Sequence, residues 1–137
     1  MDLIERIKSE FPYGSINLLK VDVYRSHKIT VTIVKEDGRV SISDCEKITR
    51  LLKNFISDDF DLIVQSPGIG WAISLDNELK FFKNEKVLVF YEDKGKILNK
   101  KLIFKKEEDN FLFFEDLKKK TEVKIEKNKI KKMKTEL

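Results

Sequence analysis

The chain has 137 residues, of which 41% are hydrophobic and 38% are charged. This length suits one domain or two very small ones, and the composition is typical of a soluble protein with a packed core. Its longest apolar runs span four or five residues, far short of the roughly 20 that cross a bilayer. The charged N-terminus does not resemble a signal peptide, and a single cysteine excludes an internal disulfide. We therefore expect a cytoplasmic protein with no membrane partner.

The net charge of +4 is unevenly distributed along the chain. Residues 1–75 contain 10 basic and 11 acidic side chains, whereas residues 76–137 contain 18 basic and 13 acidic ones. A basic second half favours a polyanionic partner such as RNA. The other interpretation is that lysine and glutamate simply keep a small domain soluble. Nearly all of the positive charge is lysine, which makes point-charge contacts, so we do not expect base-specific recognition.

The first elements in the chain are a predicted helix and a predicted hairpin. Residues 2–11 place their apolar side chains on one face, and Asp2 is a suitable N-cap. Apolar and polar residues then alternate over 16–24 and again over 29–34, with a short polar loop between them. This pattern predicts two antiparallel strands.

A second helix is predicted over residues 42–57, which carry one continuous apolar stripe. Ser43 and Glu46 have the spacing of a capping box, in which each side chain bonds the backbone amide of the other residue. Ser41 and Asp44 have the same spacing and compete for this role. The start of the helix is therefore uncertain by about two residues.

A third strand is predicted over residues 60–65, directly before Ser-Pro-Gly. Since this strand follows a helix, it can lie parallel to the second strand through a right-handed crossover. We predict an α-β-β-α-β domain over residues 1–70, with a three-stranded sheet and both helices on one face. The predicted hinge after it comprises Ser66, Pro67, Gly68, Gly70 and Trp71.

The remaining residues, 71–137, show short alternating runs at roughly ten-residue spacing. Four or five such strands predict a small β-barrel, so the fold class is α+β. Residues 75–82 suggest one helical turn, and the basic C-terminal stretch either extends the last strand or trails as a tail. We expect Trp71 to pack between the two domains.

The sequence offers little catalytic or metal-binding chemistry. His27 and Cys45 are the only residues of their types and fall on different predicted elements, whereas a catalytic dyad needs a base beside its nucleophile. Cys45 lies on the apolar stripe of the second helix, where a small core residue is expected. No metal-binding spacing is present. We predict that the protein is not an enzyme and has neither a metal nor a cofactor.

The densest positive region suggests contacts with RNA phosphates, which would weaken strongly with salt. A solvated strand face is the alternative. The candidate contacts are Lys118, Lys119, Lys120, Lys124, Lys127, Lys129, Lys131 and Lys132.

Three segments resemble the bacterial ribosome maturation factor RimP family. ISDCEKITRLL (42–52) resembles the start of that family's second helix, and FDLIVQSPGI (60–69) resembles its strand and hinge. ELKFFKNEKVLVFY (78–91) is similar to the family's entry into its second domain. The chain departs from the family after Gly68, where Ile69-Gly70-Trp71-Ala72 replaces a hydrophobic-Asp-Arg-Pro sequence. Any contact made by that Asp–Arg pair is therefore missing.

The resemblance implies an SH3-like, Sm-like barrel as the second domain and a non-enzymatic role. It implies a ribosome assembly factor that matures the small (30S) subunit. The implied partners are the free pre-30S subunit, its rRNA and a decoding-region ribosomal protein, number twelve of that subunit. We expect a monomer. The alternative function is a general Sm- or SH3-type adaptor that binds RNA or peptides away from the ribosome.

Overall fold

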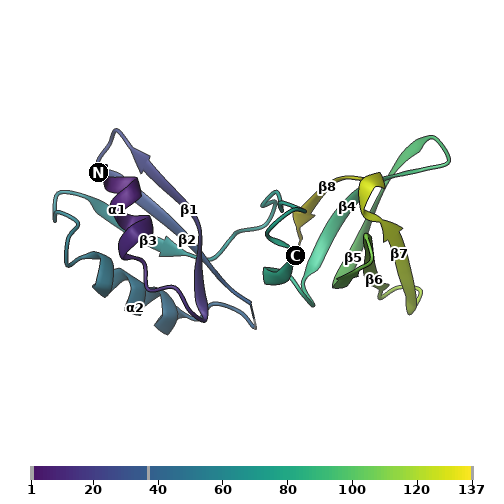
Figure 1. The fold of residues 1–137 in the computed structure, drawn as a ribbon, viewed down its shortest axis with the longest axis horizontal. Helices are drawn as coiled ribbons and strands as arrows, with labels where there is room; N and C mark the ends of the chain where they lie inside the picture. The colour runs from purple at the N-terminus through teal and green to yellow at the C-terminus, as the bar shows by residue number, and fades with distance from the viewer. Residues whose placement is uncertain (1, 37, 137) are drawn as a thin grey trace. The chain divides into compact units, whose positions relative to one another are not determined.

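The computed structural model describes residues 2–36 and 38–136 and has an α+β fold. The chain divides into two compact units, Met1–Pro67 and Gly68–Leu137 (Figure 1). The observed division lies three residues before the predicted boundary after residue 70.

The first unit has the predicted order of elements. These are α1 (Leu3–Glu10), β1 (Ile16–Tyr24), β2 (Lys28–Lys35), α2 (Ile42–Leu52) and β3 (Asp61–Gln65). β1 pairs with β2 in antiparallel fashion, and β3 pairs with β2 in parallel, as the crossover argument predicts. The Asp2 side chain caps α1 by accepting a hydrogen bond from the Glu5 amide at 2.8 Å.

Both helices pack against one face of this sheet. Alternate residues of β2 share a face, and those at 29, 31 and 33 are fully buried together with apolar residues of both helices. This core contains Ile7, Phe11, Ile16, Ile29, Val31, Ile33, Ile48, Leu52 and Ile56.

The N-cap of α2 is Ser41, so the predicted capping box of Ser43 and Glu46 is wrong and its competitor is confirmed. The backbone of Ser41 is extended, with φ −93° and ψ 167°, as an N-cap requires. The Ser41 hydroxyl accepts a hydrogen bond from the Asp44 amide at 3.1 Å. The Asp44 carboxylate accepts one from the Ser41 amide at 2.8 Å. Ser43 already lies inside the helix.

α2 ends at Leu52, five residues before the predicted end at 57. The amides of Asn54 and Phe55 donate to the carbonyls three residues earlier, at 3.3 and 3.2 Å. Such bonds belong to a tightened last turn. Asn54 and the polar run after Ile56 favour turns over helix.

The second unit is a five-stranded antiparallel sheet. Its strands are β4 (Lys86–Asp93), β5 (Lys96–Glu108), β6 (Phe111–Asp116), β7 (Thr121–Glu126) and β8 (Ile130–Thr135). Two short 3-10 turns, η1 (Leu79–Phe81) and η2 (Lys127–Lys129), precede β4 and β8. The strand order is β7-β6-β5-β4-β8. Lys94 and Gly95 join β4 to β5 with φ of 52° and 79°, as a type I′ turn requires.

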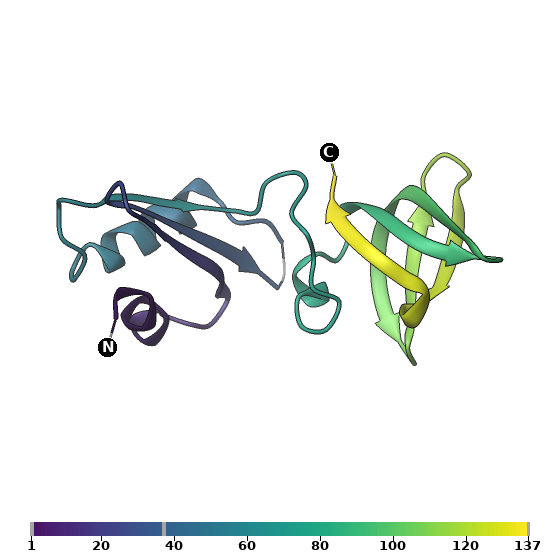
Figure 2. The same ribbon diagram turned by 90° about the horizontal axis from the view of Figure 1, so that it is seen from above.

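This sheet curls around a shared interior (Figure 2), but it does not close. Within the part of the chain that the structure describes, β7 pairs only with β6, and β8 pairs only with β4 among the named strands. The predicted α+β fold class is confirmed, whereas the predicted small β-barrel is supported only by the curl of an open sheet. The C-terminal residues neither extend β7 nor trail as a tail. They form β8, which pairs with β4. Ile130 and Met133 of β8 are only 7% and 1% exposed. A backbone buried to this degree needs hydrogen-bond partners, and β4 supplies them.

Candidate nucleic-acid interface

The eight lysines predicted to contact RNA lie on several elements of the second unit. Lys118, Lys119 and Lys120 lie in the turn between β6 and β7, and the others are spread over β7, η2 and β8. Two of them are in ion pairs, which partly cancels their charge. Lys127 contacts Glu107 at 2.7 Å, and Lys131 contacts Glu92 at 3.5 Å. Lys129 is exposed beside them in η2.

Lys124 lies over aromatic rings on the outer side of β6 and β7. Its ammonium is 4.3 Å from the centroid of the Phe111 ring and 5.7 Å from that of Phe113. Lys106 approaches the Phe113 ring to 4.9 Å. On the same outer side, Glu115 lies opposite Glu122. This part of the surface is therefore mixed in charge, and its rings already have cationic partners.

A more uniformly positive surface lies on the outer side of β8, β4 and β5. Val87 and Val89 of β4 are fully buried, so Leu88 and Phe90 point outward. Directly opposed residues of antiparallel strands share a face. Phe90 is opposed by Lys132 on β8 and by Asn99 on β5. Leu88 is opposed in the same way by Lys134 and Lys101. We call these six residues the basic face: Leu88, Phe90, Asn99, Lys101, Lys132 and Lys134.

The lysines of the basic face have no carboxylate partners in the part of the chain that the structure describes. Within residues 2–36 and 38–136, none of Lys101, Lys132 and Lys134 forms an ion pair. Farther along the same side, Glu92 opposes Ile97 and Glu115 opposes Ile103. Both carboxylates are paired with other lysines, Glu92 with Lys131 at 3.5 Å and Glu115 with Lys105 at 3.4 Å.

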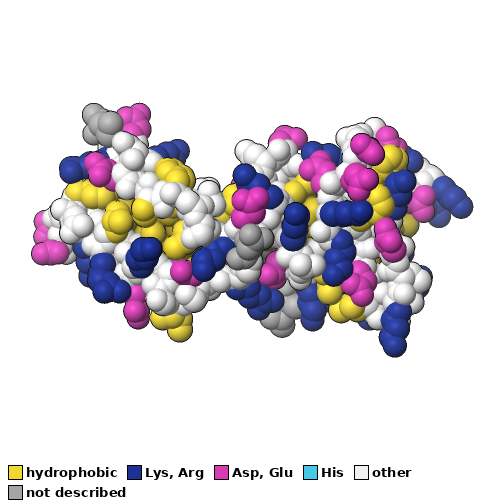
Figure 3. All heavy atoms as spheres, turned by 60° about the horizontal axis from the view of Figure 1, so that its bottom comes forward, with side chains coloured by type: hydrophobic (Ala, Val, Ile, Leu, Met, Phe, Trp, Pro, Cys, Tyr) yellow, Lys and Arg dark blue, Asp and Glu magenta, His cyan; other side chains and the backbone are white. Residues whose placement is uncertain are grey.

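Two of the positive charges of the basic face lie close together. Lys132 and Lys134 lie two residues apart on one side of β8, and the neighbouring Lys134 ammonium lowers the pKa of Lys132. A cluster of like charges without counter-ions attracts polyanions. Figure 3 shows lysine side chains on the second unit, with acidic and apolar side chains between them.

Sequence reasoning found Lys132 but missed the other five residues of the basic face. The alternation over residues 87–91 does place Leu88 and Phe90 outward. Their lysine neighbours depend on the register of β8 against β4, which no local pattern reveals.

The predicted hinge residues belong to different units. Ser66 and Pro67 lie in the first unit, and Gly68, Gly70 and Trp71 lie in the second. Gly70 donates its amide to the Thr135 carbonyl at 2.9 Å, and the Thr135 amide donates to the Trp71 carbonyl at 3.0 Å. The Thr135 hydroxyl donates to the Gly68 carbonyl at 2.6 Å and accepts from the Trp71 amide at 2.9 Å. Residues 68–71 are thus attached to the edge of β8.

Trp71 has a partner inside the second unit. It is partly buried, and its indole N–H donates to the Glu78 carboxylate at 3.3 Å. The same carboxylate accepts the Ser74 amide at 3.0 Å. The bond between the indole N–H and Glu78 fixes the orientation of the indole ring against the turn before η1.

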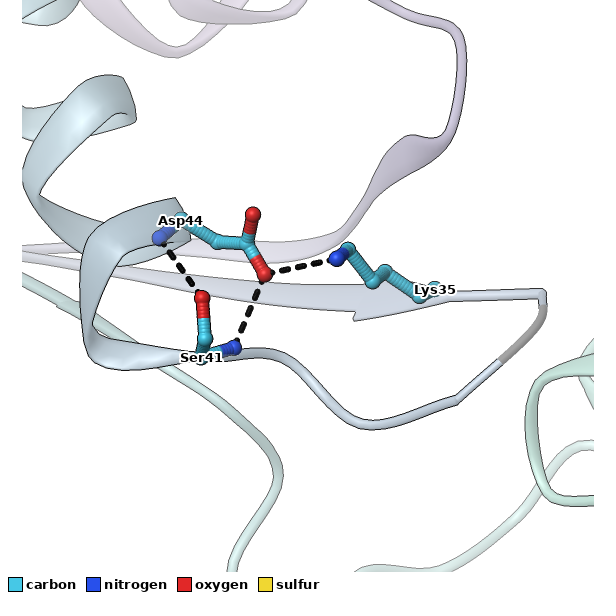
Figure 4. Close-up of polar contacts among 3 residues, drawn as sticks. All are labelled: Lys35, Ser41 and Asp44. Carbon is cyan, nitrogen blue, oxygen red and sulfur yellow. Dashed lines mark hydrogen bonds and ion pairs between the residues drawn. The ribbon is translucent and has the colours of Figure 1, made fainter.

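The main polar cluster of the first unit joins β2 to the start of α2 (Figure 4). The Lys35 ammonium lies 2.8 Å from the Asp44 carboxylate, which also accepts the Ser41 amide. The Lys35 contact, followed by the Ser41 amide, lowers the pKa of Asp44 to about 2. Partial burial, followed by the adjacent Asp44 charge, raises the pKa of the Cys45 thiol.

The remaining candidates for chemistry are dispersed. The His27 ring stacks on Phe60 with a centroid distance of 5.1 Å. No group of three or more His, Cys, Asp or Glu side chains that could hold a metal ion occurs in the described ranges. Neither helix of residues 2–36 and 38–136 is long and apolar enough to span a membrane. A comparison of the chain with models of known protein families finds no match.

Proposed function

We propose that this protein is a non-enzymatic assembly factor of the small ribosomal subunit, acting in the cytoplasm as a monomer. The observation that carries the proposal is the basic face, where three lysines that have no carboxylate partner among the described residues surround outward apolar side chains. The resemblance of residues 42–52 and 60–69 to the RimP family supports a ribosomal context.

In this proposal the second unit docks on rRNA mainly by electrostatics. Each lysine that neutralises a phosphate releases counter-ions, so affinity falls as salt rises. Three such contacts contribute a slope of about −2 to −3 in a plot of log affinity against log salt. The open edge of β7 is available to bind an extended segment of the decoding-region ribosomal protein as an added strand.

Co-sedimentation with purified free 30S subunits and with 70S ribosomes tests the proposal. We expect salt-sensitive binding to free 30S subunits and little binding to 70S ribosomes. The triple variant K101Q/K132Q/K134Q should bind at least about tenfold more weakly, because the loss of even one lysine–phosphate contact, of the order of 1.5 kcal/mol, weakens binding about tenfold. The variant K8Q/K47Q/K53Q is the control, since it removes the same charge from exposed positions of the first unit.

Equal binding of the two ribosomal particles, or no binding to either, would contradict the proposal. Equal losses in the two triple variants would instead show that only net charge matters. Capture of a non-ribosomal RNA or peptide in preference to subunits would favour the adaptor alternative.

A further inference from the structure

Phe90 differs from the other outward rings of its sheet because no residue in the described part of the chain is its aromatic or cationic partner. Phe111 and Phe113 are covered by Lys124 and Lys106. Among the residues that the structure describes, none makes a ring contact or a cation–π contact with Phe90. The ring is partly exposed at the centre of the basic face. Its outer side is therefore available for stacking.

The groups beside Phe90 suit a nucleotide. Lys132 lies directly across from Phe90 on β8, and Lys134 and Lys101 lie in the adjacent row. Directly opposed residues have Cβ atoms about 4.5–5.5 Å apart, so these ammonium groups can reach phosphates on either side of a base on the ring. On β5, the side-chain amide of the exposed Asn99 forms no hydrogen bond within residues 2–36 and 38–136. It can both donate to and accept from a base edge.

An unpaired strand uses all of these groups, whereas a duplex uses only some of them. In double-stranded RNA the faces of the bases are stacked inside the helix, so only phosphates and the minor-groove edge are accessible. Proteins that bind single strands combine a positive surface with aromatic side chains on which bases stack. An acidic protein segment would satisfy the lysines but would not use the free ring.

We propose that the basic face binds an unpaired stretch of RNA, with one base stacked on Phe90 and the flanking phosphates held by Lys101, Lys132 and Lys134. This inference rests on the RNA-binding part of the proposed function and adds the kind of RNA that is recognised. Asn99 hydrogen-bonds the edge of the stacked base. The lysines contact only phosphates, so binding tolerates different base sequences.

Fluorescence anisotropy of the full chain tests the inference with a short labelled oligouridylate and an RNA duplex of the same length. The variant Phe90→Leu keeps an apolar side chain but removes the π surface. It should weaken binding of the single strand roughly five- to a hundredfold, the range for loss of one base–aromatic stack. Binding of the duplex should change less than about twofold, and Phe90→Trp should restore single-strand binding. Phe113→Leu is the matched control, because its ring is already covered by lysines.

A second measurement uses the unaltered protein and so does not depend on how a variant folds. Ultraviolet cross-linking to oligouridylate followed by mass spectrometry should place the cross-link on the peptide that contains Phe90. A cross-link confined to other peptides overturns the inference. So does equal loss of single-strand and duplex binding in Phe90→Leu, or tighter binding of polyglutamate than of oligouridylate. Unchanged co-sedimentation of Phe90→Leu with 30S subunits would agree with the proposed assembly role but would contradict base stacking on Phe90.

Discussion

Ser41 and Ser43 both have the spacing to act as the N-cap of α2, and Lys35 contacts the capping box that forms. The side chain of Ser41 satisfies an amide of the first helical turn, and Asp44 returns a bond to Ser41. Asp44 also contacts Lys35 at the end of β2. The alternative box at Ser43 has the same local spacing but lacks this contact. The choice is therefore made by tertiary structure.

Replacement of the N-cap tests this assignment. Ser41→Ala should lower the free energy of unfolding by about 0.5–2 kcal/mol, because it leaves a helix amide without its acceptor. Ser43→Ala is the matched control and should change it by less than about 0.5 kcal/mol, since Ser43 lies within the helix and is exposed. Urea denaturation followed by circular dichroism measures both. A larger effect at Ser43 than at Ser41 would contradict the assignment.

The same cluster should make stability depend on acid pH. The Lys35 contact and the Ser41 amide hold the pKa of Asp44 at about 2 in the folded protein, below the ordinary value of 3.8. A lowered folded pKa means that the stabilisation is present above about pH 4 and is lost as the pH falls towards about 2.

Asp44→Asn should therefore remove part of this loss of stability between about pH 4 and pH 2. Its unfolding free energy should be lower than that of the native chain at neutral pH, and the two should converge in acid. Asp58→Asn is a control with the same change of charge in an exposed turn. Parallel curves for the native chain and Asp44→Asn would refute the prediction.

Among the elements, the segment 68–73 is not a named strand, but it is hydrogen-bonded alongside β8. Ile73 donates its amide to the Met133 carbonyl at 2.8 Å, and Ala72 forms a bridge with Lys134. The Thr135 hydroxyl contacts both Gly68 and Trp71. The Thr135 side chain thus adds two hydrogen bonds to the backbone bonds that hold the beginning of the second unit against β8.

Thr135→Val should loosen this segment, because valine has the shape of threonine without its hydroxyl. We expect a loss of about 1 kcal/mol in the free energy of unfolding and faster hydrogen exchange at the Trp71 amide. Thr121→Val, on the exposed start of β7, provides the matched control. Unchanged exchange at Trp71 would mean that its bond to the hydroxyl contributes nothing to protection.

The elements also show where sequence reasoning succeeds and where it stops. The strand at Ile16–Tyr24 was predicted with its observed bounds, although a register shift between Leu18 and Lys20 interrupts its alternation. β8 escaped recognition because its buried residues, Ile130 and Met133, are three positions apart. A register shift opposite Phe90 and Tyr91 lets both point inward. Without the position of β8, the neighbours of Phe90 cannot be assigned, so the sequence does not predict the basic face.

The whole molecule combines two units of different charge. Up to Pro67 the chain contains 10 basic and 11 acidic side chains, and from Gly68 onward it contains 18 and 13. The sequence predicted this contrast, because charge can be counted without a structure. The exact start of the second unit could not be predicted. The Ser-Pro-Gly pattern signals a turn but does not show which later strand pairs with the residues after it.

Comparing two fragments of the chain tests where the second unit begins. One begins at Gly68, where the structure divides, and the other at Trp71, where the sequence predicts the division. The shorter fragment lacks the Gly70 amide that donates to Thr135 and the Gly68 carbonyl that accepts its hydroxyl. At about 0.5–1.5 kcal/mol for each bond, fragment 71–137 should be about 1–3 kcal/mol less stable than fragment 68–137.

Thermal and urea unfolding of both fragments measures this difference, and Thr135→Val in each fragment is the internal control. The substitution should cost more in fragment 68–137 than in fragment 71–137, because Gly68 is present only in the longer one. Both fragments should bind oligouridylate with similar affinity, since each retains the whole basic face. Equal stability of the two fragments would mean that residues 68–70 are only a connection and that the predicted boundary is the physical one.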